Sequence, residues 1–204
     1  MVIASGAGAL PGSAQDLTTA YPTQIDGILP GQNDVNMFQL DIFYPSLFSA
    51  IAVPLITGIP DTELFLFDSG GNPVYMNDDM TGSDTLSCLP SVVSNPCPSS
   101  PGGLGPSTPG IYYLAITRAL QLPQDAGSNY LFTYLVSDFT STDIQGPAGG
   151  TGSIAGWDGL ANTAPNYDAN LYAIDLTGTV PEPGSGLLMA AIAGAWAIRR
   201  KLTA

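Results

Sequence analysis

Short apolar segments alternate with turn residues along most of the chain. Phe38, Leu40 and Ile42 alternate with the polar residues Gln39 and Asp41, which is the two-residue period of a strand with one buried face. We expect further strands where other apolar or β-branched segments occur, and no amphipathic helix of ordinary length before the C-terminal tail. These other segments are residues 49–56, 63–67, 73–77, 111–117, 130–136 and 171–176.

Turn-forming residues separate these segments. Residues 68–72 read Asp-Ser-Gly-Gly-Asn and predict a β-hairpin between residues 63–67 and 73–77, because Gly and Asn accept positive φ angles. Residues 90–110 and 146–156 are rich in Pro, Gly and Ser, and we expect them to form long surface loops. The pattern therefore predicts an all-β fold, a small antiparallel β-sandwich.

The composition is that of one folded, acidic domain. The 204 residues are 45% hydrophobic and 10% charged, which distinguishes them from a disordered chain. Four Lys and Arg face seventeen Asp and Glu, for a formal net charge of −13, so we expect no nucleic-acid partner. The chain has no His, which excludes Ser-His-Asp and Cys-His catalysis and His-ligated zinc.

The few cations are unevenly distributed. Arg118 is the sole cation of residues 1–198, so one positive charge faces seventeen negative ones and this part carries a formal charge of −16. Salt bridges cannot neutralise so many carboxylates, which must be solvated, protonated or bound to cations from solution. Calcium is the first candidate for such a cation.

The C-terminal segment has three successive parts. A Pro-rich stop is followed by residues 184–198, fifteen residues without charge, and then by three cations. Fifteen helical residues span about 22 Å, which snorkelling cations extend towards a hydrocarbon core of about 30 Å. We expect a single C-terminal transmembrane helix with its basic end in the cytoplasm; a buried core helix is the alternative. The stop and the cations are Pro181, Glu182, Pro183, Arg199, Arg200 and Lys201.

This order of parts closely resembles the PEP-CTERM sorting signal of Gram-negative bacteria. The resemblance covers about the last 25 residues. It implies that exosortase, a membrane-embedded, cysteine transpeptidase-like enzyme, recognises the signal and cuts near the Pro-Glu-Pro motif, so that the tail is an address and a transient anchor. We therefore assign residues 180–204 to the sorting signal and residues 15–179 to the body, and we expect the protein in the cell envelope, on the surface or outside the cell.

Export also requires a secretory signal at the N-terminus. Residues 1–14 have a short apolar stretch, and Gly12 and Ala14 are placed as in an A-x-A-like cleavage site, but a basic n-region is missing. We interpret residues 1–14 as the remnant of a signal peptide that begins upstream of Met1. A disordered N-terminal arm is the alternative.

The body carries a series of short motifs, which are DVNMF at 34–38, DTELFLFD at 61–68, GN at 71–72, NDD at 77–79 and PGIYYLAI at 109–116. In this order they resemble a second family, the bacterial pre-peptidase C-terminal (PPC) domain. The motifs that carry this resemblance span about residues 34–136, with Asn36 where the family usually has Asp. The resemblance implies a jelly-roll-like sandwich that accompanies secreted proteins without catalysis of its own, and some relatives bind calcium or polymers such as collagen.

Acidic and amide side chains lie at the ends of the strands that form the predicted hairpin. Calcium takes six to eight oxygen ligands, which carboxylates, Asn amides and loop carbonyls supply. Turn chemistry is the alternative, because Asp and Asn also bond to their own backbone in bends. We hypothesise a structural Ca²⁺ site with ligands Asp61, Asp68, Asn77, Asp78 and Asp79.

Three further features bear on function. Cys88 and Cys97 predict a disulfide in an exported protein, with two free thiols as the alternative. The pairs Asp78–Asp79 and Asp61–Glu63 are nominal candidates for glycoside hydrolysis, but adjacent residues on a strand point to opposite faces. Three aromatic residues allow either an exposed patch that stacks on sugars or loop anchors in the core. These are Trp157, Tyr167 and Tyr172.

The sequence favours a non-enzymatic, exosortase-sorted surface or extracellular matrix protein, associated with exopolysaccharide or biofilm. A carbohydrate- or protein-binding adhesion module is the second interpretation. A secreted carboxylate-dependent hydrolase is the third.

Overall fold

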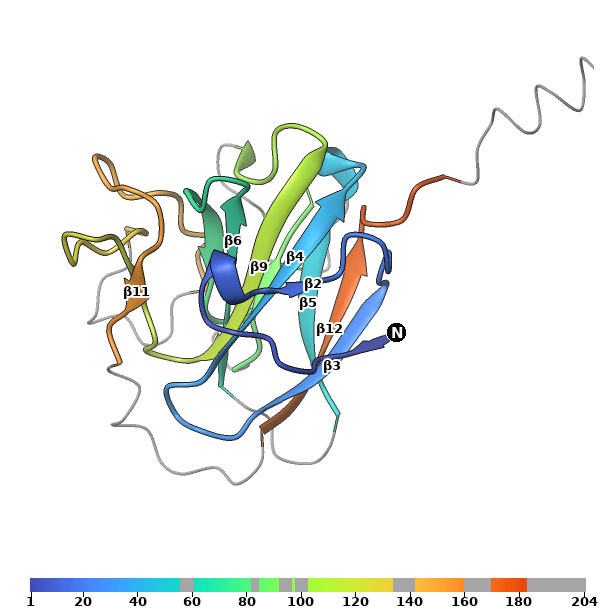
Figure 1. Ribbon diagram of the computed structural model, residues 1–204, viewed down its shortest axis with the longest axis horizontal. Helices are drawn as coiled ribbons and strands as arrows, with labels where there is room; N and C mark the ends of the chain where they lie inside the picture. The colour runs from blue at the N-terminus through green and yellow to red at the C-terminus, as the bar shows by residue number, and fades with distance from the viewer. Residues whose placement is uncertain are drawn as a thin grey trace, which may run out of the picture.

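The computed structural model (Figure 1) describes residues 1–55, 61–81, 85–91, 97, 103–133, 142–159 and 170–182. Its strands are β1 (Val2–Ile3), β2 (Gln15–Asp16), β3 (Gln24–Leu29), β4 (Val35–Ile42), β5 (Ser49–Pro54), β6 (Thr62–Asp68), β7 (Pro73–Asn77), β8 (Cys88–Leu89), β9 (Gly110–Arg118), β10 (Pro123–Gln124), β11 (Gly156–Trp157) and β12 (Asn170–Thr177). They form sheet A, in the order β1-β3-β12-β5-β8, sheet B, in the order β2-β4-β9-β6-β7, and the pair β10-β11.

The main core lies between sheets A and B. Phe38, Leu40 and Ile42 of β4 are fully buried there, as their alternation with polar residues predicts. Sheet A faces them with Ile25 of β3 and Ile174 of β12. Each such side chain contributes about 1.5–3 kcal/mol on burial, so this face stabilises the two-sheet arrangement. The prediction of an all-β sandwich is confirmed.

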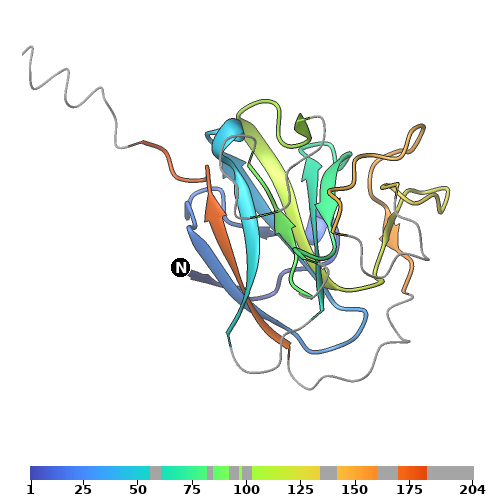
Figure 2. The same ribbon diagram turned by 180° about the vertical axis from the view of Figure 1, so that it is seen from behind.

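A second apolar layer covers the outer face of sheet B. Phe65 and Phe67 of β6 point away from the main core and pack against Phe132 and Trp157, with ring centroids 5.3 to 6.5 Å apart. Figures 1 and 2 show β11 on the side of β6 that faces away from sheet A. Because β6 is covered on both faces, six consecutive residues of this strand are buried. The expected surface loop at 146–156 is therefore partly packed, with Ile154 only 8% exposed.

Most of the predicted strands are confirmed, as β4, β5, β6, β7, β9 and β12. The segment 130–136 is an exception, because Tyr130 and Phe132 make only isolated bridges and residues 134–136 lie outside the described part. The antiparallel prediction holds except at the two short N-terminal strands. These strands, β1 and β2, pair in parallel with β3 and β4.

Residues 1–14, which we expect to be the remnant of a signal peptide, pack against the folded body, and their origin in a signal peptide stays a prediction. β1 pairs with β3, and the amide of Ala4 donates to the carbonyl of Asp26 at 2.7 Å. The carbonyl of Ala9 accepts a hydrogen bond from the indole Nε1 of Trp157 at 2.7 Å. The apolar residues that suggested a signal peptide are thus used here for packing, since Val2 packs on the main core and Leu10 on the outer layer.

The expected transmembrane helix, residues 184–198, lies outside the described residues. Within the described part, no helix has the length and apolar character that crossing a membrane requires. The two helices found there are short 3₁₀ turns, η1 (Pro11–Ser13) and η2 (Pro45–Leu47).

Candidate functional site

The chain leaves the sandwich through a fixed turn after β12. Gly178 has a φ of +75°, in the left-handed region that favours glycine, and its carbonyl accepts hydrogen bonds from the amides of Phe43 and Tyr44 at 2.9 and 3.1 Å. The Thr179 hydroxyl then donates to the carbonyl of Pro22 at 2.7 Å, and Thr179 is only 1% exposed. These bonds hold the end of the body between two loops.

The residues after Thr179 lie at the surface. Val180 is 42% exposed and Glu182 is exposed, while the Glu182 amide donates to the Tyr44 hydroxyl at 3.1 Å. The first two residues of the Pro-Glu-Pro motif are therefore presented directly beside the body. The remaining predicted motif residues lie outside the described part; they are Pro183, Arg199, Arg200 and Lys201.

A family model described as the PEP-CTERM protein-sorting motif matches residues 179–201. The tail carries a sorting motif. The match supports exosortase as the processing partner and export to the cell envelope of Gram-negative bacteria. It begins at Thr179, so the boundary between motif and body coincides with the last buried residue that the structure describes. No curated protein matches the chain.

A group of carboxylates lies where β6 begins and β7 ends. The register that pairs Leu64 with Asn77 brings the start of β6 beside the turn after β7. Carboxylate oxygens of Asp61, Asp78 and Asp79 all lie within 4.8 Å of one another. The structure thus brings together three of the five predicted calcium ligands, which we call the acidic cluster.

Glu63 adjoins the acidic cluster and was not among the predicted ligands. Its side chain is fully buried and accepts hydrogen bonds from the amide of Leu120 at 3.2 Å and the hydroxyl of Thr117 at 3.3 Å. Burial raises the pKa of Glu63 well above its usual value, and the nearby carboxylate of Asp78 and, to a smaller extent, that of Asp61 raise it further. Its two-residue spacing from Asp61 was the sequence signal for a shared strand face.

Burial also changes the acidity of Asp61. Loss of hydration raises the pKa of this carboxyl group to about 6. Asp78 and Asp79 are 2% and 5% exposed. Negative charges held this close in a poorly hydrated place disfavour full ionisation.

The other two predicted ligands have different roles. The Asn77 amide oxygen accepts a hydrogen bond from the amide of Cys88 at 2.8 Å, and its nitrogen donates to the carbonyl of Asp79 at 3.1 Å. Asn77 thus fixes the turn that carries the cluster. Asp68 lies at the opposite end of β6, where its carboxylate accepts hydrogen bonds from the amides of Gly70 and Asn72 at 2.8 and 2.9 Å. Turn chemistry describes Asp68.

The acidic cluster suits cation binding better than hydrolysis. Oxygens around calcium lie 2.3 to 2.6 Å from the ion, so ligands on opposite sides are about 5 Å apart, and the spread of the cluster fits this size. A hydrolase needs carboxylates that a polymer can reach, whereas Glu63, Asp78 and Asp79 are buried.

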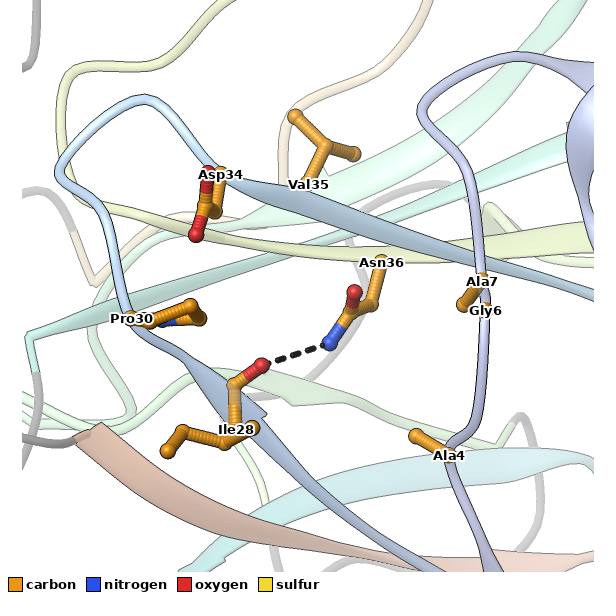
Figure 3. Close-up of a pocket in the computed structure, with 8 residues that line it drawn as sticks. All are labelled: Ala4, Gly6, Ala7, Ile28, Pro30, Asp34, Val35 and Asn36. Atoms are coloured by element: carbon orange, nitrogen blue, oxygen red, sulfur yellow. Dashed lines mark hydrogen bonds between the residues drawn. The ribbon is translucent and has the colours of Figure 1, made fainter.

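A pocket of about 340 Å³ lies between the N-terminal segment and the ends of β3 and β4 (Figure 3). The Asn36 side chain in this pocket donates to the carbonyl of Ile28 at 2.9 Å and to the hydroxyl of Tyr172 at 2.7 Å. The carboxylate of Asp34, on the same rim, accepts a hydrogen bond from the amide of Gly31 at 2.6 Å. The polar residues of the DVNMF motif thus brace neighbouring strands.

The remaining predicted features are structural in the described part. Cys88 and Cys97 form a disulfide, with their Cα atoms 5.6 Å apart. Trp157 anchors the outer layer and Tyr172 is only 1% exposed, so neither provides an open platform for sugars. Tyr167 lies outside the described residues.

Proposed function

We propose that the protein is an exported, non-enzymatic surface or extracellular matrix protein, held in the membrane by its tail until exosortase releases it. The sorting motif at residues 179–201 is the observation that carries this proposal. Residues 184–198 would form the transmembrane anchor, with Arg199, Arg200 and Lys201 on its cytoplasmic side. The released body would associate with exopolysaccharide or surface proteins, as in a biofilm.

The body is proposed to be a PPC-like, jelly-roll-like accessory module without catalysis of its own. The two-sheet sandwich and the burial of Glu63, Asp78 and Asp79 support this, because a buried carboxylate group does not offer a polymer a cleavage site. The adhesion alternative finds no open platform at Trp157 or Tyr172, and the hydrolase alternative relied on pairs that include the buried Glu63, Asp78 and Asp79.

Calcium is proposed to bind the acidic cluster and stabilise the body. Asp61, Asp78 and Asp79 would supply carboxylate oxygens, and the adjoining Glu63 of β6 would add to the negative field when ionised. A bound divalent cation offsets the repulsion among carboxylates that have little hydration to do so. Calcium would then link the start of β6 to the turn after β7.

Thermal unfolding tests the calcium proposal. We expect the melting temperature of the protein to rise with calcium and to fall with chelator, because a ligand that binds only the folded state stabilises it. In the variant Asp78→Asn this calcium response should be lost, whereas Asp68→Asn, which changes a carboxylate at the other end of β6, should keep it. Identical melting curves of the unsubstituted protein with calcium and with chelator would remove the proposal.

Processing in a host that carries an exosortase tests the sorting proposal. We expect intact mass spectrometry to find a released protein that lacks the residues after the cleavage point near Pro181–Pro183. The double variant Pro181→Ala, Glu182→Ala should accumulate at full mass in the membrane fraction. Pro109→Ala, which changes an exposed proline in the body, should be processed normally. Equal processing of the double variant and the unsubstituted protein would contradict the proposal.

A further inference from the structure

Exposed apolar side chains surround the point where the tail leaves the body. Tyr21 and Leu47 are 42% and 46% exposed, and Val180 follows the last buried residue at 42%. The Tyr21 ring packs edge-on against Phe43, with ring centroids 5.6 Å apart, and Tyr44 bonds to the amide of Glu182. We call these five residues, Tyr21, Phe43, Tyr44, Leu47 and Val180, the exit patch.

Backbone contacts hold the exit patch together. The amides of Phe43 and Tyr44 donate to the carbonyl of Gly178, and the Thr177 hydroxyl donates to the carbonyl of Leu47. Tyr21 adopts a φ of +46°, which is uncommon for a residue with a side chain and places its ring beside Phe43. Figure 1 shows the loops before β3 and after β4 at the same end of the sandwich as the tip of β12. The patch is therefore a built surface around the exit.

The length of chain between the body and the apolar tail is short. The Glu182 amide is held at the Tyr44 hydroxyl, and the uncharged stretch begins at Gly184. Two extended residues span at most about 7 Å. The headgroup layer on one side of a bilayer is about 5–7 Å thick, so a helix that enters the hydrocarbon near Gly184 places the Tyr44 ring at the headgroups.

We propose that the exit patch contacts the bilayer that holds the tail, and that it seats the body on the headgroup layer while the sorting motif awaits cleavage. This inference rests on the proposed function of the tail as a membrane anchor. Tyr side chains suit this layer because the ring is apolar and the hydroxyl is polar. The five residues of the patch are uncharged, so the contact depends on apolar burial and not on attraction to anionic lipid.

Insertion of the tail makes such a small patch sufficient for contact with the bilayer. A surface of five residues on a body with 16 acids and one Arg, a formal charge of −15, does not hold a free protein on a membrane, and anionic lipid repels it. When the tail is inserted, contact becomes intramolecular and the effective concentration of the surface is high. Cleavage of the tail removes this advantage, so the body leaves the membrane on processing.

Nuclear magnetic resonance on the full chain in phosphatidylcholine nanodiscs tests the contact. A nitroxide on the lipid headgroup broadens methyl signals steeply with proximity, relative to nanodiscs without nitroxide. We expect the methyl groups of Leu47 and Val180 to relax several-fold faster than those of Ile28 and Leu55, which are 42% and 40% exposed. Ile28 pairs with Leu171 at the start of β12, and Leu55 follows Pro54, which pairs with Tyr172. Both lie about 20 Å along β12 from its end at Thr177, so they are a matched internal control.

Substitution of the patch provides the second arm. In Tyr21→Ser, Leu47→Ser, the excess relaxation at Val180 should fall, whereas Ile28→Ser, Leu55→Ser should leave it unchanged. If the chain floats with lipid vesicles but the methyl groups at both ends of the sandwich relax equally fast, the proposed contact of the exit patch is wrong and the membrane anchor is not affected. A chain that fails to float with lipid vesicles overturns the proposed membrane anchor and the patch with it. Stronger contact with phosphatidylglycerol than with phosphatidylcholine contradicts the uncharged mode of binding.

Discussion

Asp61 illustrates how position changes the chemistry of one carboxyl group. Its pKa is raised from 3.8 to about 6 by burial, so between these values the folded protein holds a proton that the unfolded chain has released. Stability from this group is therefore fully present below about pH 4 and is lost as the pH rises through about 6. Calcium would offset that loss above pH 6, because it stabilises the ionised form.

The variant Asp61→Asn separates this effect from the rest of the acidic cluster. In chelator at pH 7 we expect the variant to be more stable by about 1 kcal/mol, because a partly exposed carboxylate is replaced by a neutral isostere. Its advantage should shrink as the pH falls from 7 to 4, since Asp61 then becomes neutral as well. Chemical denaturation at both pH values measures this, and an advantage that grows on acidification would contradict it.

Gly178 fixes the path of the chain into the sorting motif. A Cβ atom at this position would lie 2.8 Å from the Cα of Phe48 and the carbonyl oxygen of Tyr44, and φ is +75°. We expect Gly178→Ala to destabilise the protein by at least about 2 kcal/mol. Gly149→Ala is the control, because nothing lies within 4 Å of the added atom. Thermal unfolding compares the two, and equal melting temperatures would refute the role of Gly178.

Single residues were only partly predictable from the sequence. The cluster of Asp61, Asp78 and Asp79 followed from the predicted hairpin, because neighbouring strands bring the residues at their ends together. Asp68 did not join them, since the other end of the same strand is about 20 Å away. The sequence could not show the burial of Glu63, which depends on a loop after β9 that folds over it.

At the scale of elements, the layer outside sheet B depends on Trp157. Its ring contacts Phe65 and Phe67, and its indole nitrogen bonds to the carbonyl of Ala9. We expect Trp157→Ala to lower stability by about 2–3 kcal/mol and to increase binding of a hydrophobic dye, because the outer face of β6 becomes accessible. Trp157→Phe keeps an aromatic ring but not the hydrogen bond to Ala9, and it should lose less stability than Trp157→Ala. Unchanged dye binding in Trp157→Ala would show that other residues hold the layer.

Elements with a regular alternation were predicted well, and those that depend on tertiary contacts were missed. β3 contains Asp26 and Gly27, which have low strand propensity. Gly27 is nevertheless required in the sheet, because an added Cβ would clash with the ring of Tyr172. Conversely, residues 130–133 have strand-like composition, but in the described part they pair only through isolated bridges over the outer face of sheet B.

The same type of turn occurs twice, and the sequence analysis predicted only the first one. Asp68 and Asn72 close the hairpin between β6 and β7, and Asp125 and Asn129 make the same set of hydrogen bonds after β10. Both turns have the spacing D-x-G-x-N, with the Asp carboxylate accepting two backbone amides and the Asn side chain. These bonds lower the pKa of Asp125 to about 2, so the second turn keeps its charged acceptor in mild acid.

At the scale of the whole molecule, the excess of negative charge causes repulsion among the acidic side chains. Residues 1–198 carry a formal charge of −16, and one cation cannot pair with seventeen acids. In the presence of chelator we expect the melting temperature to rise by a few degrees when sodium chloride increases from about 0.01 M to about 0.15 M, because the Debye length falls from about 30 to about 8 Å. Choline chloride should have the same effect. A melting temperature that falls with salt would show that attractive pairs dominate.

The sequence determined the whole molecule more completely at its C-terminus than in its body. The tail has three parts in a fixed succession, and each part is recognised from its local composition. It could therefore be identified without knowledge of the fold. The N-terminal segment was different, since residues 1–14 are apolar in a way that suits both a cleaved leader and a packed edge. The structure shows their contacts with β3 and Trp157, and their origin in a signal peptide stays a prediction.

The disulfide between Cys88 and Cys97 indicates when the body of the protein reaches its final structure. Bonds of this kind persist in oxidising compartments and are rare in the reducing cytosol. The amide of Cys88 holds Asn77, which in turn fixes the turn that carries Asp78 and Asp79. The cross-link beside that turn is thus closed only after the chain has crossed the inner membrane. Maturation of the body and departure from the cytosol are consequently one event, and a molecule that never left would be recognisable by two free thiols.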